Sequence, residues 1–458
     1  MTSEDNTPKL RLGQQISYSA PNFAMNLSGV LFASWLTYFY LPPDDEITGR
    51  VALVAASAFA IAQLFGRVVD ALADPFVGYW SDRCRGRWGR RLPFLLFGSP
   101  VLAISFLAMW FPPFAPGSLG NSIYLIATLC FYWFAFTLVV APYFALLPEI
   151  AKSNKARVLL SSSMAIFTVL GMAVGNFAIG PVQSAYPDGI NLFGWHIPTG
   201  IQFMAILSAV VLLLLFWTPL INIREAAYTP AKEVPKGLFT GLLTAFRNPA
   251  FKTYLAMACL IQMGVTLIGA SLPYLATQVL AAKPGGDGLI PAGEGETWAG
   301  ILGGVVVVLA ALCFPLVNIL VPKLGKKKLF VLAGIMMATI LFIIPIVTLF
   351  PDPAIPAFVL FVGLSFPLSA ALVLPNAIYA DVVDFDADQS GIRREGTYTG
   401  ATALVTKAGI GLAQAAVVAL LVFGNTRANP TGILLCFPLG ALFVGLGTWL
   451  FSKHPIDK

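Results

Sequence analysis

Four charged residues lie inside apolar stretches of the chain, where a charge is costly. Arg67, Asp70 and Asp74 follow one another at spacings of three and four residues, and Lys407 lies far along the chain. On a helix this spacing places the first three on one face. Two carboxylates one turn apart repel each other unless a cation or a proton lies between them. The residues therefore predict a site for a coupling cation, Na⁺, Li⁺ or H⁺, with Arg67 and Lys407 as competing internal cations.

The same four residues permit other interpretations. Their formal charges sum to zero, so they could form a buried salt-bridge cluster that only locks the protein together. Alternatively, Lys407 fills the cation site permanently and the protein is a uniporter. A polytopic enzyme that holds Mg²⁺ with Asp70 and Asp74 is disfavoured, because phosphate chemistry usually needs more carboxylates than these two. Pro75 follows Asp74 directly and is expected to break the helix, which would free backbone carbonyls as further ligands.

The composition identifies the environment of these charges. Of 458 residues, 57% are hydrophobic and 11% are charged, against roughly 25% charged residues in a soluble domain. A soluble globular enzyme is thereby excluded, and the chain is predicted to be a polytopic protein of a bacterial inner membrane or a plasma membrane. Its partners are the lipid bilayer and a small-molecule substrate. The net charge of +6 needs no nucleic acid to explain it. We expect a monomer, with no cofactor besides the coupling Na⁺ or H⁺.

Apolar runs between charged, proline and glycine breaks predict an all-α integral membrane fold with 12 transmembrane helices. The predicted spans are 16–41, 51–79, 93–112, 121–147, 158–180, 201–221, 251–280, 298–320, 329–349, 356–378, 397–423 and 431–451. If both termini are cytoplasmic, 23 of the 28 basic residues lie on the inside, as the positive-inside rule requires. The longest inside connection divides the chain into a half at 1–221 that carries the cation site, a central loop at 222–250 and a half at 251–458.

The two halves carry corresponding motifs. A basic loop follows the second span at 82–91, and another follows the eighth at 323–328. The fourth span ends in Pro-Tyr-Phe-Ala-Leu-Leu-Pro-Glu149, and the tenth ends in Pro-Asn-Ala-Ile-Tyr-Ala-Asp381. Two six-helix halves with corresponding features are typical of the major facilitator fold, in which the substrate site lies between the halves and access alternates.

The stretches 66–82, 86–93 and 379–409 resemble the glycoside–pentoside–hexuronide:cation symporters of the major facilitator superfamily. The resemblance implies a secondary transporter that couples a cation, Na⁺ by preference, to uptake of a glycoside or other sugar-like solute. It places the paired cation-binding aspartates of that family on Asp70 and Asp74. A threonine of the fourth helix that helps to bind sodium falls on Thr137, and the lysine of helix 11 falls on Lys407.

The sugar-binding residues of the family are less well matched. Its first-helix aspartate aligns with Asn22, its fourth-helix aspartate with Val140, and the tryptophan of that helix with Phe144. No lysine or arginine occurs between Arg157 and Arg224 to match its fifth-helix arginine. A neutral glycoside is the expected substrate, and a lysophospholipid or other amphiphile is the alternative, since related eukaryotic transporters carry lysophosphatidylcholine. The candidate cavity residues are Tyr18, Asn22, Asn26, Val140, Phe144 and Asn376.

Charged residues at the inside ends of the spans predict a cytoplasmic gate. In the first half these are Asp82, Arg83, Arg90 and Arg91, where Asp82 is expected to pair with an arginine and close the inside face. Their expected partners in the second half are Asp381, Asp384, Arg393, Arg394 and Glu395.

Overall fold

The structure is a computed structural model of the chain. It describes residues 11–455 except 44–49, 85–88, 152, 193, 224–247, 284 and 391–394. Within these ranges, the side chains of residues 82, 83, 148, 154, 155, 387, 389, 390 and 395–397 are also left undescribed. The described chain is almost wholly helical and divides into two compact units, one from Met1–Tyr40 and Ala52–Pro230, the other from Leu41–Val51 and Ala231–Lys458.

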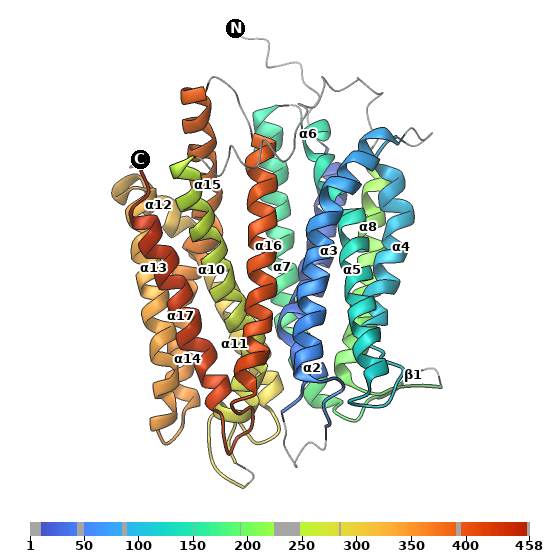
Figure 1. Cartoon of the computed structure of the whole chain (residues 1–458), viewed down its shortest axis with the longest axis vertical. Helices are drawn as coiled ribbons and strands as arrows, with labels where there is room; N and C mark the ends of the chain where they lie inside the picture. Colours follow the sequence, from blue (N-terminus) through green and yellow to red (C-terminus); the bar gives the residue numbers. More distant parts are fainter. Residues whose placement is uncertain are drawn as a thin grey trace. The chain divides into compact units, whose positions relative to one another are not determined.

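The first unit consists of helices and one short hairpin (Figure 1). In chain order its elements are α1 (Leu12–Val30), η2 (Leu31–Trp35), α2 (Leu36–Tyr40), α3 (Ala56–Arg83), α4 (Leu92–Ala108), α5 (Leu119–Ala145), α6 (Leu147–Ile150), α7 (Asn154–Ala185), β1 (Ile190–Leu192), β2 (Trp195–Ile197) and α8 (Gly200–Asn222). The two strands pair antiparallel, with Asn191 opposite His196. Helix α3 packs against α5, α1 packs against α7 and α8, and α4 packs against α5 and α8.

The second unit is helical in its described part. Its elements are α10 (Pro249–Tyr274), η3 (Leu275–Leu280), α11 (Gly295–Leu312), α12 (Phe314–Leu324), α13 (Lys326–Ile343), η4 (Ile344–Leu349), α14 (Ala354–Gly363), α15 (Ser365–Ser390), α16 (Glu395–Leu421) and α17 (Thr431–Ser452). Helix α10 packs against α16 and α17, α13 packs against α15 and α17, and α11 packs against α15. The helices of the second unit thus pack in the same pattern as those of the first.

Ten described helices are long and apolar enough to cross a membrane, and α4 is a shorter apolar helix. Most of their side chains are apolar, which suits helices that face lipid on one side and neighbouring helices on the other. The chain is therefore a multi-pass integral membrane protein.

Helix α3 corrects one sequence expectation. Pro75 lies inside α3, and the helix continues to Arg83, so the predicted break after Asp74 is wrong. A proline removes only one N–H donor from a helix, and packing of α3 against α5 holds the flanking turns in place. The carbonyl of Ala71, four residues before Pro75, still loses its helical donor.

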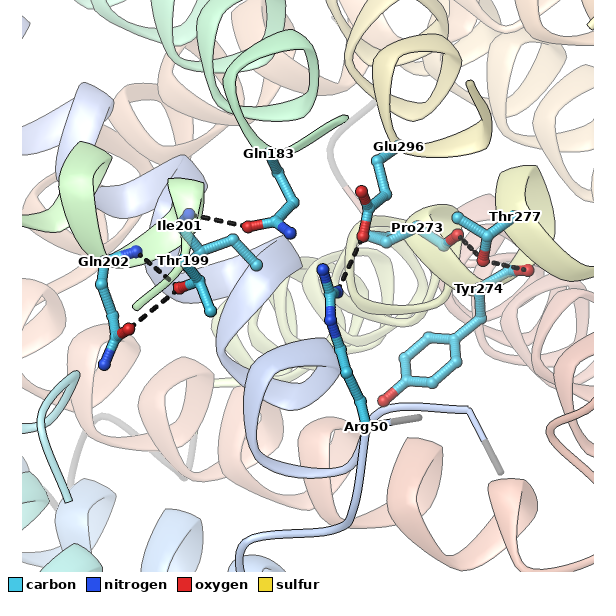
Figure 2. A network of polar contacts seen from close by, with 9 residues as sticks. All are labelled: Arg50, Gln183, Thr199, Ile201, Gln202, Pro273, Tyr274, Thr277 and Glu296. Carbon is cyan, nitrogen blue, oxygen red and sulfur yellow. Dashed lines mark hydrogen bonds and ion pairs between the residues drawn. The ribbon is translucent and has the colours of Figure 1, made fainter. Parts of the chain in front are cut away.

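Polar side chains fix the helix starts. Thr199 caps α8 by accepting a hydrogen bond from the backbone N–H of Gln202 at 3.2 Å (Figure 2). Gln183, near the end of α7, accepts a hydrogen bond from the N–H of Ile201 at 2.8 Å. Ser118 and Asn248 cap α5 and α10 in the same way. These contacts satisfy N–H groups that have no partner within their own helix.

Candidate cation and substrate site

Asp70 is the buried centre of the first unit's polar site. Asp70 lies on α3 and is 1% exposed. Its Oδ1 accepts a hydrogen bond of 2.8 Å from Oγ1 of Thr137 on α5. Thr137 is also buried, at 2%. The long contact between α3 and α5 brings these side chains together. A carboxylate and a hydroxyl, both withdrawn from solvent, present oxygen ligands to one point.

Arg67 lies one turn before Asp70 and is nearly as buried. Its Nη1 is 3.6 Å from Oδ2 of Asp70, an ion pair longer than a hydrogen bond. Its guanidinium lies 3.9 Å from the ring centre of Trp133 and 5.9 Å from that of Phe32. The aromatic faces stabilise the cation where water is excluded. Arg67 is therefore held beside Asp70 without a tight bond to it.

Gly66 allows this aromatic contact. A Cβ at this position would lie 2.8 Å from Cδ1 of Trp133, closer than side chains tolerate. The absence of a side chain therefore lets the indole approach α3 and cover the guanidinium of Arg67.

Asp74 and Lys407 are half-buried, Asp74 on α3 of the first unit and Lys407 on α16 of the second. Asp74 follows Asp70 by one turn of the uninterrupted helix, so the two carboxylates share a face as the spacing predicts. The roles of Asp74 and Lys407 stay predictions.

The predicted cavity residues of the first helix bind neighbouring helices. Tyr18 is fully buried and stacks on Tyr143 of α5 at 4.8 Å between ring centres. Its hydroxyl donates to the carbonyl of Tyr143 at 2.9 Å. Asn22 donates from Nδ2 to the Tyr143 hydroxyl at 2.7 Å, and Asn26 donates to Thr168 Oγ1 on α7 at 3.3 Å. Tyr18 and Asn22 thus clamp α1 to α5, while Asn26 ties α1 to α7.

The remaining cavity candidates differ in exposure. Val140 is buried at 8%, whereas Phe144, one turn later on α5, is 46% exposed. Asn376 is exposed on α15 of the second unit. Phe144 and Asn376 are accessible to a solute or to lipid, whereas the side chain of Val140 is packed inside the first unit.

At the predicted cytoplasmic end, each unit contains an ion pair at the corresponding place. Glu149 Oε1 pairs with Arg90 and, at 2.8 Å, with Nη1 of Arg91. In the second unit, Lys326 Nζ pairs with Asp381 Oδ2 at 2.6 Å. In both units a basic residue after the second span of the half meets an acidic residue at the end of its fourth span.

Of the other gate residues, Asp384 alone has a side chain that the structure describes. Asp384 is exposed on α15. The side chains of Asp82, Arg83 and Glu395, and the whole of Arg393 and Arg394, lie outside the described residues. Their gate roles stay predictions.

A second charged contact lies at the opposite end of the second unit. Arg50 Nη1 pairs with Glu296 Oε1 at 2.9 Å, and Figure 2 shows the two side chains facing each other near Thr277. The Tyr274 hydroxyl donates to the carbonyl of Leu41. Leu41 and Arg50, which lie between α2 and α3 in the chain, thus pack with the second unit, although α2 and α3 belong to the first.

Two residues of the site were missed from the sequence. Gln63 lies four residues before Arg67 and is fully buried, so its place on the polar face of α3 was available from spacing. Glu149 ends a motif that the sequence singled out, but its arginine partners follow from the fold.

Comparisons with known proteins agree with this architecture. The chain matches the model of the MFS/sugar transport protein family over residues 17–434. The crystal structure of nucleoside transporter NupG superposes with a TM-score of 0.65 at 12% identity, over 97% of this chain and 100% of that chain. At that identity the likeness is one of fold. The fold and polar site thus define a membrane protein of transporter architecture. The chain belongs to the glycoside–pentoside–hexuronide:cation symporter family of the major facilitator superfamily, as its motifs predicted.

Individual relatives differ in the length that they share. The chain is 28% identical to an uncharacterized symporter, YnaJ, of Bacillus subtilis, over 71% of this chain and 65% of the relative, less than two thirds of its length. It is 23% identical to the isoprimeverose transporter of Lactiplantibacillus pentosus, over 91% of this chain and 81% of that one. It is 30% identical to sodium-dependent lysophosphatidylcholine symporter 1 of Xenopus tropicalis, over 38% of this chain and 32% of that one.

Proposed function

We propose that the protein is a cation symporter that moves a neutral glycoside-type solute by alternating access. The observation that carries the proposal is the buried contact of Asp70 with Thr137, beside the loosely held Arg67. The proposed topology has twelve spans, in which Leu12–Tyr40 and α4 join the ten long apolar helices, with both termini cytoplasmic.

Asp70, Asp74 and Thr137 would hold the cation. All three offer oxygen, and the hard character of carboxylate and hydroxyl ligands fits Na⁺ better than a soft metal. A buried carboxylate beside a like charge gains most from a counter-ion. Arg67 supplies that charge when the site holds no ion, since its guanidinium lies 3.6 Å from Asp70.

Coupling requires that the cation bind one state of the transporter better than another. Na⁺ at Asp70 would displace the positive charge of Arg67 from this carboxylate and change the packing of α3 against α5. The ion pairs of Arg90 and Arg91 with Glu149 lie in the segments that follow the C-terminal ends of these same helices, on the side proposed to be cytoplasmic. A change in the α3–α5 contact would reach them through the helices themselves.

The charges of the first unit favour a neutral substrate. Arg67 and Asp70 contact each other, and Asn22 and Val140 stand where the family has acidic sugar ligands. Without a charged bidentate ligand, recognition depends on amides, hydroxyls and aromatic faces, which suit an uncharged glycoside. The similarity to an isoprimeverose transporter over most of both chains supports a glycoside.

A lysophospholipid is the second candidate substrate. It is favoured by the similarity to a sodium-dependent lysophosphatidylcholine symporter, which covers a smaller part of each chain. The exposed Phe144 beside the buried Val140 would suit an acyl chain as well as a sugar face.

Uptake into proteoliposomes tests the proposal. Labelled isoprimeverose, a neutral aryl glycoside and lysophosphatidylcholine are each supplied with an inward Na⁺ gradient, an inward H⁺ gradient, or choline chloride in place of both. We expect accumulation of a glycoside above equilibrium only with a cation gradient. Accumulation of the lysophospholipid alone would show that the substrate is an amphiphile and not a glycoside. Equilibration of a solute to equal concentrations inside and outside, with or without a cation gradient, would support a uniporter.

A further inference from the structure

Gln63 is a buried polar residue of α3 that has no role in the cation site proposed above. It is 0% exposed, and neither atom of its carboxamide has a hydrogen-bond partner among the described residues. Leaving a buried amide without partners costs stability, because the bonds it made to water are not replaced. An amide retained at such a position calls for a partner that is present in another state of the protein.

The geometry of α3 identifies that partner as Arg67. Gln63, Arg67, Asp70 and Asp74 follow one another at spacings of four, three and four residues, so they form one stripe along the helix. Long side chains on a helix lean toward its N-terminus and over the residue four positions earlier. The stem of Arg67 therefore leads toward Gln63, and its contact with Asp70 requires it to turn toward the next residues of the stripe.

The present contacts of Arg67 leave it free to move between these two neighbours. Its ion pair with Asp70 is 3.6 Å long, and its Nε has no hydrogen-bond partner in the described part of the chain. Trp133 and Phe32 hold the guanidinium through their ring faces, which do not fix its direction as a hydrogen bond would.

We propose that Gln63 is a positioning residue that accepts the guanidinium of Arg67 when a cation occupies Asp70. The inference rests on the proposed cation site and deepens it. In the ion-free state Arg67 neutralises Asp70. In the ion-bound state the guanidinium donates to Oε1 of Gln63 and remains between the aromatic rings. Gln63 thereby lowers the cost of releasing Asp70 and sets the affinity for the cation.

Two substitutions at Gln63 give opposite predictions. Gln63→Leu keeps the volume but removes the acceptor, so Arg67 stays on Asp70 and the Na⁺ affinity falls by about tenfold. Gln63→Glu offers Arg67 a carboxylate, so Asp70 is released and the affinity rises by a similar factor. The Na⁺ concentration at the midpoint of the rise in melting temperature measures the affinity. Asn176→Leu is the control, because it removes an amide on α7 that donates to the Met172 carbonyl.

A carboxylate at position 63 would also attract Na⁺ directly, and a double-mutant cycle with Arg67→Gln separates the two effects. If Gln63 acts through Arg67, neither Gln63 variant shifts the midpoint once the arginine is absent. If the Arg67→Gln protein does not fold, Arg67→Lys takes its place in the cycle. Effects of both Gln63 variants that stay unchanged in that background would then overturn the role of Arg67.

The outcomes separate this inference from the proposed function. A Na⁺ response that Asp70→Asn abolishes, with both Gln63 variants like the wild type or shifted in the same direction, overturns the role of Gln63 and leaves the cation site standing. A wild-type protein that responds to neither Na⁺, Li⁺ nor pH overturns the cation site and this inference with it.

Discussion

Thr137 donates a hydrogen bond of 2.8 Å to Asp70, and both side chains are withdrawn from solvent between α3 and α5. This contact joins a carboxylate that needs a counter-charge to a neutral hydroxyl that cannot supply one. It therefore keeps the oxygen atoms of Asp70 and Thr137 together while, in the proposed cycle, a cation replaces Arg67 as the positive partner of Asp70.

Replacing Thr137 by valine removes the hydroxyl with little change in volume. We expect the Na⁺ affinity to fall by about tenfold, because one oxygen ligand is lost and Asp70 loses its donor. Thr137→Ser retains the hydroxyl and is expected to bind Na⁺ nearly as the wild type does. Melting temperature against NaCl, with choline chloride at equal ionic strength, measures both. Equal affinities of the valine and serine variants would exclude Thr137 as a ligand.

Gly66→Ala tests the aromatic cover of Arg67. The new Cβ would approach Trp133 within 2.8 Å and push the indole away, at a cost of about 1–3 kcal/mol. Gly78→Ala on the same helix is the matched control, since no atom lies within 4 Å of a Cβ there. For Gly66→Ala alone, we expect a lower melting temperature and stronger quenching of tryptophan fluorescence by a soluble quencher, because Trp133 becomes less buried. Equal melting temperatures and equal quenching in the two variants would mean that Trp133 can move away from α3 with no loss of stability.

Glu149→Gln tests the ion pairs at the predicted cytoplasmic end of the first unit. Glu149 faces two arginines, so the substitution leaves both partly buried cations without their counter-charge, at a cost of about 1–3 kcal/mol. Thermal unfolding measures the loss, and in a transport assay we expect the variant to favour opening toward the cytoplasm. Asp381→Asn, which breaks the corresponding pair with Lys326, is expected to act in the same direction. Opposite effects of the two variants on the accessibility of the cytoplasmic side would contradict equivalent roles.

His454 predicts the pH dependence of the second unit. It follows α17, is 3% exposed, and approaches Thr253 Oγ1 at 2.6 Å through Nδ1. Burial, and then the charge of Lys327, lowers the pKa of His454 from 6.5 to about 4, against a smaller opposing effect of Asp381. The unfolded chain therefore binds an extra proton between these two pH values. The native state is fully stabilised above pH 6.5 and loses stability as the pH falls toward 4.

Melting temperatures between pH 7.5 and pH about 4.5 check this prediction. His454→Gln removes the titrating ring and is expected to lose less stability on acidification than the wild type does. His196→Gln is the control, because His196 is exposed on β2. An unchanged acid dependence in His454→Gln would assign the effect to other groups.

The all-helical membrane fold and the shared face of Arg67, Asp70 and Asp74 could be predicted from the sequence, because they follow from local apolar runs and helical spacing. The proximity of Thr137 to Asp70 came from the family resemblance, since no spacing within one helix relates α3 to α5. The position of Gln63 on the same face followed from spacing as well and was overlooked.

Other features depend on tertiary contacts that spacing does not encode. Asn22 is a plausible cavity residue in the sequence, but its amide binds the Tyr143 hydroxyl from a helix more than a hundred residues later. Pro75 suggested a broken helix, and the packing of α3 against α5 keeps it continuous. The association of Leu41–Val51 with the second unit likewise depends on partners such as Glu296 and Tyr274, which lie far along the chain.

Thermal unfolding of the purified protein against NaCl, compared with choline chloride, tests the central claim most directly. A ligand that binds the native state raises its melting temperature by mass action. We predict a Na⁺-specific rise for the wild type that is lost in Asp70→Asn and in Asp74→Asn, while the Asn176→Leu control keeps it. A rise that persists unchanged in both aspartate variants would contradict a cation site at Asp70 and Asp74.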